Sequence, residues 1–138
     1  MWSFEFRHET SAQPAAIWKL WSNPAAWPRW DDDLEEVTLE GPFEVGTKGA
    51  LTPKGMDAIP FELTRVALES GYTDESELPG AVLRFDHDLL AHGERFVIVQ
   101  RVTMTGPSAN DYFADLGRDI VLDVPDALRK LAALAETA

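Results

Sequence analysis

The feature that most constrains the fold is one long amphipathic helix predicted at the end of the chain. Its apolar residues recur every three or four positions, the spacing that places side chains on one helix face. They are Phe113, Leu116, Ile120, Val124, Ala127, Leu131 and Leu134. Such a helix has about 27 residues and a length of roughly 40 Å. Because proline removes a backbone donor, we expect a bend at Pro125.

Most of the chain before this helix has the pattern of β-strands. Residues 2–11 alternate apolar and polar side chains, which is typical of a half-buried strand. Pro14 then begins a helix that ends at Asn23-Pro24, and a short second helix continues to Trp30. Six further strands, separated by glycine- and proline-containing turns, are predicted at 33–40, 47–52, 58–68, 71–77, 80–91 and 94–106. The short gaps between them indicate hairpins and therefore an antiparallel meander.

This order of elements predicts an α+β fold with one domain over residues 1–138. A seven-stranded sheet must bury its apolar face, and the only long element able to cover it is the C-terminal helix. One helix does not fill the concave face of so large a curved sheet. We therefore expect an internal cavity between the sheet and the helix, where small molecules bind.

Composition excludes several classes of partner. The formal net charge of −12 disfavours nucleic acid and anionic membrane surfaces. No apolar run approaches ~18 residues, so no membrane span is expected. The first residues lack the features of a signal peptide, which makes the cytoplasm the expected location. The absence of cysteine excludes disulfides, thiolate nucleophiles and cysteine-based metal sites.

Three segments resemble the helix-grip fold of the SRPBCC superfamily, which includes START-like lipid-transfer domains and polyketide cyclases and dehydratases. Residues 14–31 (PAAIWKLWSNPAAWPRWD) are similar to the helical entry of that fold, with its W-x-x-W close. Residues 41–47 (GPFEVGT) are similar to the connector between its second and third strands. The amphipathic C-terminal helix is the third. The resemblance implies a cavity for an apolar or amphipathic molecule, and it transfers no catalytic residue. We expect no cofactor.

The most prominent candidate for chemistry is His87, in the triplet Asp86-His87-Asp88. Neighbours in a strand point to opposite faces, so His87 faces the cavity while both aspartates face outward. The three therefore do not form a relay. His87 alone is a possible general acid or base, although an ordinary pocket-lining histidine is the more common case.

Other candidates are ligand-binding rather than catalytic. Gln100 is a polar residue among apolar ones on its strand and is suited to orienting a ligand, or to a buried amide pair. The aromatic candidates for lining or rimming the cavity are Phe61, Phe85, Phe96, Tyr112 and Phe113. All five tryptophans lie within the first 30 residues, where we expect them to pack the helical entry onto the sheet.

No metal site is predicted. Asp31-Asp32-Asp33 could hold a hard cation, but it lacks the other oxygen ligands at regular spacing, so a solvated turn is expected. We give the same interpretation to Asp74-Glu75-Ser76-Glu77.

Three hypotheses for function follow. The first is a protein that binds a small apolar molecule. The second is an enzyme similar to polyketide cyclases and dehydratases, with His87 as acid or base and Gln100 or Tyr112 orienting the substrate. The third is a protein-interaction module similar to chaperone-ATPase activators of the same fold. The ligand and the oligomeric state are left open.

Overall fold

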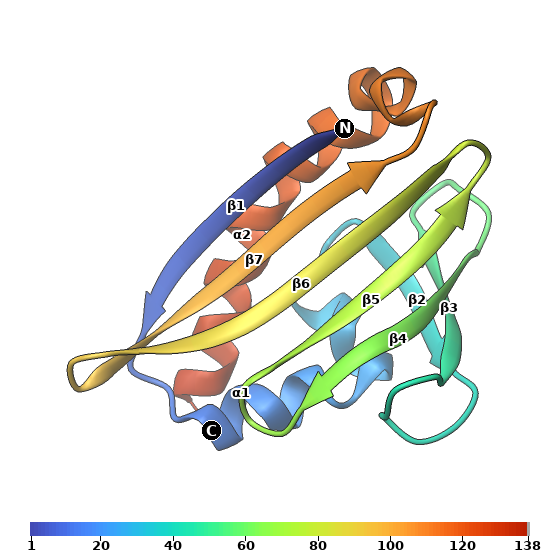
Figure 1. Ribbon diagram of the computed structural model, residues 1–138. Coiled ribbons are helices and arrows are strands. Elements are labelled where there is room, and N and C mark those ends of the chain that lie inside the picture. The colour runs from blue at the N-terminus through green and yellow to red at the C-terminus, as the bar shows by residue number, and fades with distance from the viewer. Residues whose placement is uncertain (138) are drawn as a thin grey trace.

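Seven strands form one antiparallel sheet in the computed structural model, which describes residues 1–137 (Figure 1). The strands are β1 (Trp2–Thr10), β2 (Leu34–Leu39), β3 (Lys48–Pro53), β4 (Ile59–Ala67), β5 (Gly71–Leu78), β6 (Ala81–His92) and β7 (Arg95–Thr105). The helical elements are α1 (Pro14–Trp21), η1 (Pro24–Arg29), η2 (Ala109–Tyr112), η3 (Phe113–Gly117) and α2 (Arg118–Glu136). The α+β order predicted from the sequence is confirmed.

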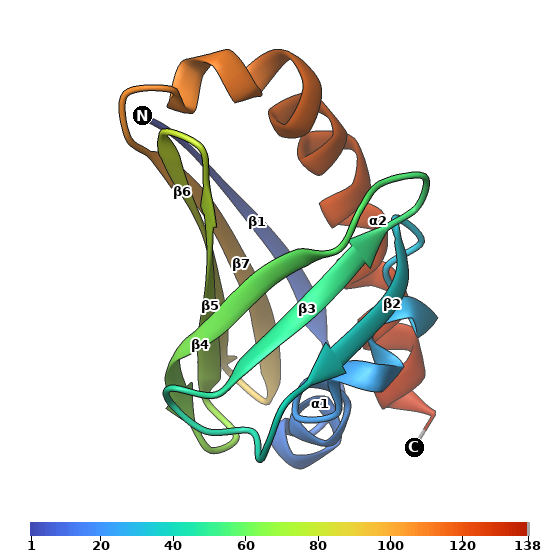
Figure 2. The same ribbon diagram turned by 90° about the vertical axis from the view of Figure 1, so that its right-hand side faces the viewer.

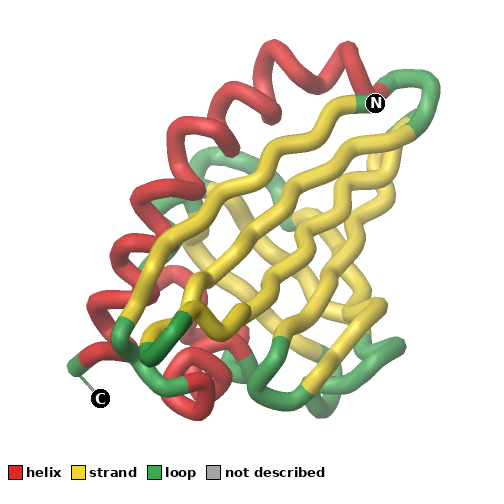
Figure 3. The backbone as a smooth tube through the Cα atoms, turned by 60° about the vertical axis from the view of Figure 1, so that its left-hand side comes forward, coloured by secondary structure: helices red, strands yellow, loops and turns green. Residues whose placement is uncertain are grey.

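The sheet order is β1-β7-β6-β5-β4-β3-β2, so β2 to β7 form a meander and β1 joins its far edge beside β7. The strands lie side by side in Figure 3, and α2 runs along the concave face of the sheet that they form. Register shifts in β2 (between Leu34 and Glu36) and β4 (between Leu63 and Arg65) interrupt the ladders, and such irregularities bend a strand. Figure 2 shows the resulting curvature, which brings β2 and β3 around toward α2.

The C-terminal helical segment is irregular at its start and regular through Pro125. The helix α2 continues through Pro125, so this proline does not end it, and the bend expected there stays a prediction. Pro125 lies on the exposed side of the helix. The carbonyl of Val121, which receives no N–H from Pro125, can bond to water there. A change of direction lies at the wide turn η3, before α2 begins (Figure 2). Its last residue, Gly117, lies so close to Phe113 that an added Cβ would be 3.0 Å from that ring.

The core lies between α2, α1 and the concave face of the sheet. From the predicted stripe, α2 buries Ile120, Val124, Ala127 and Leu131. Ile17 and Trp21 of α1 are at most 1% exposed and close the same core from the other side. Burying side chains of this size stabilises the fold by roughly 1.5–3 kcal/mol each.

None of the helices within residues 1–137 combines the length and the apolar character needed to cross a membrane.

Candidate functional site

A cavity of about 220 Å³ lies between the concave face of the sheet and α2. Its apolar walls comprise Trp21, Trp27, Trp30, Leu34, Leu51, Met56, Ile59, Leu83, Phe85, Leu116, Ile120, Val124, Ala127, Leu128 and Leu131. Sites for drug-sized ligands are roughly 300–1,000 Å³. The cavity therefore fits a smaller molecule than these.

The register of β5, β6 and β7 determines which polar groups reach the cavity. Tyr72 lies opposite His87, and His87 lies opposite Gln100 on the next strand. Asp74 is two residues beyond Tyr72 and therefore on the same face of β5. At the start of β5, a Cβ on Gly71 would come within 2.2 Å of the His87 carbonyl oxygen. Glycine at this position permits the close approach of β5 to β6 beside His87.

Tyr72 is the centre of an aromatic stack in the wall of the cavity. Its ring lies 4.1 Å from the His87 ring, centroid to centroid, and the two are nearly parallel at 9°. Trp27 stacks on it from another side at 5.7 Å, and Trp21 meets it edge-on at 5.5 Å. The Trp27 indole nitrogen donates a hydrogen bond to the Trp21 carbonyl oxygen, which fixes the orientation of the ring.

Two buried polar atoms in this wall have no hydrogen-bond partner among residues 1–137: Asp74 Oδ1 and His87 Nδ1. Asp74 is 3% exposed and His87 is 9% exposed. Burial raises the pKa of Asp74 to about 8, and nearby Asp86 and Glu75 act in the same direction. Burial lowers the pKa of His87 to about 3. At neutral pH both side chains are therefore mainly uncharged.

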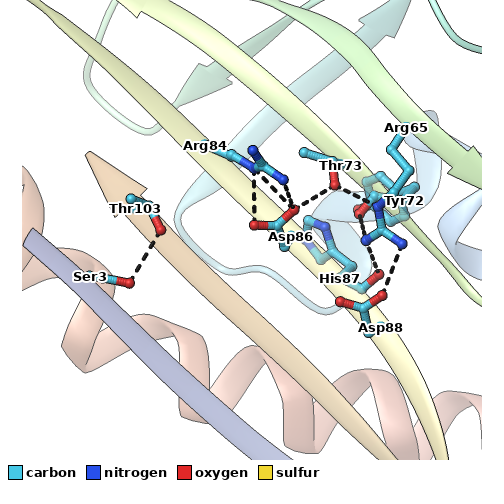
Figure 4. A network of polar contacts seen from close by, with 9 residues as sticks. All are labelled: Ser3, Arg65, Tyr72, Thr73, Arg84, Asp86, His87, Asp88 and Thr103. Carbon is cyan, nitrogen blue, oxygen red and sulfur yellow. Dashed lines mark hydrogen bonds and ion pairs between the residues drawn. The ribbon is translucent and has the colours of Figure 1, made fainter. Parts of the chain in front are cut away.

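The outward face of the same strands carries a paired network (Figure 4). The Asp86 carboxylate accepts a hydrogen bond from Thr73 Oγ1 at 2.6 Å and forms an ion pair with Arg84 at 3.0 Å. Arg65 pairs with Asp88 at 3.0 Å. The predicted alternation of Asp86, His87 and Asp88 between the two faces is thus what the structure shows.

The mouth of the cavity is acidic. Asp31, Asp33, Asp119 and Asp123 lie at its lining, together with one cation, Lys54. Burial raises the pKa of Asp31 and of Asp123, and the two carboxyl groups are joined by a hydrogen bond. Two carboxyl groups in such contact share a proton, because they do not both ionise readily.

Three of the predicted ligand-binding residues line the cavity: His87, Gln100 and Phe85. The structure brings them together from β6 and β7, with Phe85 and His87 ring centroids 6.4 Å apart. Their role in binding remains a prediction.

The other four predicted residues lie outside the lining. Phe61 is 3% exposed and stacks on the outer side of Trp27 at 5.8 Å. Phe96 is half-buried near the β6–β7 hairpin. Tyr112 uses its hydroxyl to donate to the Pro79 carbonyl oxygen at 2.9 Å. Phe113 is 41% exposed and packs on Phe4 and Trp2, because the wide turn η3 rotates it away from the stripe of α2.

Two expectations about carboxylate runs are corrected. Asp74 and Ser76 are not in a solvated turn but buried in β5, each 3% exposed. Asp31 is half-buried at the mouth against Asp123, although Asp32 and Asp33 are exposed as expected.

Strand parity could have revealed Asp74. Tyr72 is the only aromatic residue of its strand, and the residue two positions on must share its face. Asp119 and Asp123 each precede a buried position of α2, Ile120 and Val124, which places them at the border of its apolar stripe.

Among residues 1–137, no group of three or more histidine, aspartate or glutamate side chains is arranged to hold a metal ion.

No family model and no curated protein matches the sequence. Several solved structures match the fold. Ara h 8.0201 has a TM-score of 0.77 at 14% identity over 99% of both chains. The protein TTHA0849 from Thermus thermophilus has a TM-score of 0.74 at 15% identity, over 98% of this chain and 97% of that chain. The di-domain ARO/CYC protein StfQ from the steffimycin biosynthetic pathway has a TM-score of 0.77 at 14% identity, over 98% of this chain and 50% of that one. At these identities the likeness shows the architecture.

Proposed function

We propose that this chain, which has the helix-grip fold of the SRPBCC superfamily, binds a small molecule in the cavity between its sheet and α2. The observation that carries this proposal is the pair of buried atoms without protein partners among residues 1–137, Asp74 Oδ1 and His87 Nδ1, in a mainly apolar wall. Leaving a buried polar atom unpaired costs about 1–3 kcal/mol. The polar end of a ligand could bond to these two atoms and recover this free energy, while an apolar body would contact the apolar side chains of the wall.

Filling the cavity tests the proposal. Ala127 lines the cavity from α2, whereas Ala133 lies on the exposed side of the same helix. Ala127→Trp is therefore expected to exclude the ligand, and Ala133→Trp is the matched control. Native mass spectrometry of gently purified protein is expected to show excess mass in the wild type and in the control, and none in Ala127→Trp. Thermal unfolding of all three proteins verifies that they are folded.

If Ala127→Trp retained the same excess mass as the wild type, the ligand would lie elsewhere and the proposal would be wrong.

A second candidate function is catalysis of the cyclase or dehydratase type, and one observation favours it. His87 is uncharged and has an unpartnered ring nitrogen at the cavity wall, which could accept a hydrogen bond from a bound substrate and orient it, whereas a pKa of about 3 makes the ring a weak base. The fold likeness to an ARO/CYC protein is consistent with this role. The variant His87→Ala separates the two functions. Unchanged ligand affinity together with lost turnover would favour the enzyme, whereas a change in affinity alone would favour binding.

A further inference from the structure

Asp74 is a buried carboxyl group without a counter-ion. The side chain lines the cavity, is 3% exposed, and has one oxygen with no hydrogen-bond partner within residues 1–137. Ionised carboxylates in protein interiors are normally paired with a cation or bound to a metal. The charges that act on Asp74 are those of Asp86 and Glu75, and both are negative.

The nearby arginines do not supply that cation. Arg84 is bound to Asp86 through three hydrogen bonds of 3.0–3.1 Å. Arg65 donates to Thr73 Oγ1 at 3.0 Å and pairs with Asp88. Both guanidinium groups lie on the outward face of the sheet (Figure 4). The only lysine or arginine in the lining is Lys54, among the acidic residues of the mouth.

The surroundings of Asp74 suit an ammonium group. Aromatic faces attract cations, with tryptophan the strongest, and the lining contains Trp21 and Trp30. Trp27 and Tyr72 also line the cavity, but other rings stack on them. Asp74 and His87 occupy diagonal positions on neighbouring strands, about 7 Å apart at Cβ. An ammonium group has three N–H donors, and His87 Nδ1 is an acceptor when the ring proton is on Nε2. One ammonium group could therefore bond to both unpartnered atoms.

The mouth has the matching charge. Asp33 and Asp119 face a ligand on its way in, and the proton-sharing pair Asp31 and Asp123 adds one further negative charge, against the single positive charge of Lys54. A cleft lined by one sign of charge concentrates ligands of the opposite sign and speeds their association.

Resting on the binding function proposed above, we propose that the ligand is a small organic cation, an aromatic or other apolar body with one protonated amine. The amine pairs with Asp74 at the inner wall and the apolar body fills the space beneath α2. A cavity of roughly 150 Å³ accommodates benzene. The cavity of about 220 Å³ has room for a ring and a short aminoalkyl arm.

The probes for this proposal are 2-phenylethylamine and 2-phenylethanol, which have the same shape and differ in the charged group. Binding is measured by isothermal titration calorimetry and by the fluorescence of the tryptophans in the cavity wall. At pH 8.5 the wild type is expected to bind the amine at least tenfold more tightly than the alcohol. In Asp74→Asn the preference is expected to disappear while binding of the alcohol persists.

Glu77→Gln removes one negative charge from the outward side of the same strand and is the matched control. It is expected to keep the preference for the amine.

A proton linkage provides a second readout that needs no variant. Below pH 8 the Asp74 carboxyl carries a proton, which a cation must displace, so affinity for the amine is expected to fall about tenfold per pH unit toward pH 6. Affinity for the alcohol is expected to stay constant. Tyr72 and His87 face the same space but stay uncharged over this range, because burial raises the pKa of the tyrosine and lowers that of the histidine. Asp123 at the mouth has a pKa raised to about 8 by burial and by Asp31, and it would add to the slope. The slope in Asp123→Asn lacks this contribution, and those of Asp31 and Asp33, whose pKa values burial also raises, remain beside that of Asp74.

The outcomes distinguish this proposal from the binding function itself. If amine and alcohol bound equally, and Asp74→Asn changed neither, the binding function would stand but the proposal that the ligand is a cation would be wrong. If neither probe bound at millimolar concentration, the result would count against both the cationic ligand and the binding function itself. A preference for the amine that survives in Asp74→Asn but is lost in Asp123→Asn would place the cation at the mouth and overturn the role of Asp74.

Discussion

The two faces of β5 and β6 carry carboxyl groups that are one strand apart yet differ in charge. On the outward face, burial alone would raise the pKa of Asp86, but hydrogen bonds from Thr73 and Arg84 outweigh it and the pKa is lowered. On the inward face, Asp74 has no such partner, and its pKa is raised to about 8. Thr73, the donor to Asp86, is the direct neighbour of Asp74 in sequence.

The contrast shows that hydrogen-bond donors and nearby cations, rather than residue type, decide whether a buried or half-buried carboxyl group is charged. A step of one residue along a strand exchanges a paired, partly hydrated surface for an apolar interior. Three substitutions test this difference.

The largest effect is expected for Asp74→Asn. Because the folded-state pKa is raised from 3.8 to about 8, the native state holds a proton that the unfolded chain loses. Stability is therefore lost as pH rises between these values, by about 1.4 kcal/mol per unit. The asparagine variant does not titrate, so it should be more stable than the wild type by on the order of 5 kcal/mol at pH 8 and nearly equal at pH 4. Urea unfolding at a series of pH values measures this.

An effect of Asp74→Asn that was destabilising and independent of pH would show that the native carboxyl is ionised and paired.

A smaller effect is expected for His87→Phe. Burial lowers the pKa of His87 from 6.5 to about 3, so below pH 6.5 the unfolded chain gains a proton that the native state does not. The wild type therefore loses stability from this group as pH falls from 6.5 to 3. Phenylalanine keeps the stacking on Tyr72 and removes the titration. The loss between pH 7 and pH 4 should be smaller in the variant by roughly 3 kcal/mol.

His92→Phe is the control, since His92 is exposed at the end of β6. Identical acid sensitivity of wild type and His87→Phe would mean that His87 titrates normally.

The smallest effect is expected on the outward face, for Asp86→Asn. Its lowered pKa means that the ionised form stabilises the native state above the unfolded pKa, and that this contribution is lost as pH falls through the folded pKa. Losing the charge-assisted bonds to Thr73 and Arg84 should cost about 1–2 kcal/mol at pH 7 and little at pH 2. Chemical unfolding at the two pH values measures the difference, with Asp57→Asn in an exposed loop as the control.

A cost for Asp86→Asn equal to that of Asp57→Asn at pH 7 would show that the outward network contributes no stability.

The sequence predicted the structure best where a single spacing of apolar residues, helical or strand-like, extends over a whole segment. The stripe of α2 and the alternation around His87 follow from backbone geometry, so the fold, the cavity between sheet and helix, and the inward direction of His87 were predictable. Phe113 shows the limit. It continues the stripe by spacing, but the wide turn ending at Gly117 rotates it onto Phe4.

The site was less predictable, because its polar groups are defined by neighbours that are distant in sequence. Asp74 is the first residue of the polar run Asp74-Glu75-Ser76-Glu77, and a run of this kind is usually exposed to solvent. Its burial arises because β4 and β6 flank it and α2 covers the face it shares with Tyr72. Likewise, Asp31 and Asp123 are 92 positions apart by their residue numbers, and only the fold brings the two carboxyl groups together.

The position of β1 at the far edge of the sheet has a consequence for how the chain folds. Strands β2 to β7 pair with their neighbours in sequence, so these hairpins require only short loops to close. By contrast, β1 pairs with β7, with Trp2 opposite Met104. Closing so long a loop is entropically costly and slow. During synthesis β1 is made first, yet it has no partner until β7 has emerged. We expect the hairpin wall that carries Asp74 and His87 to form early, and the docking of β1 and α2, which encloses the cavity, to limit the folding rate.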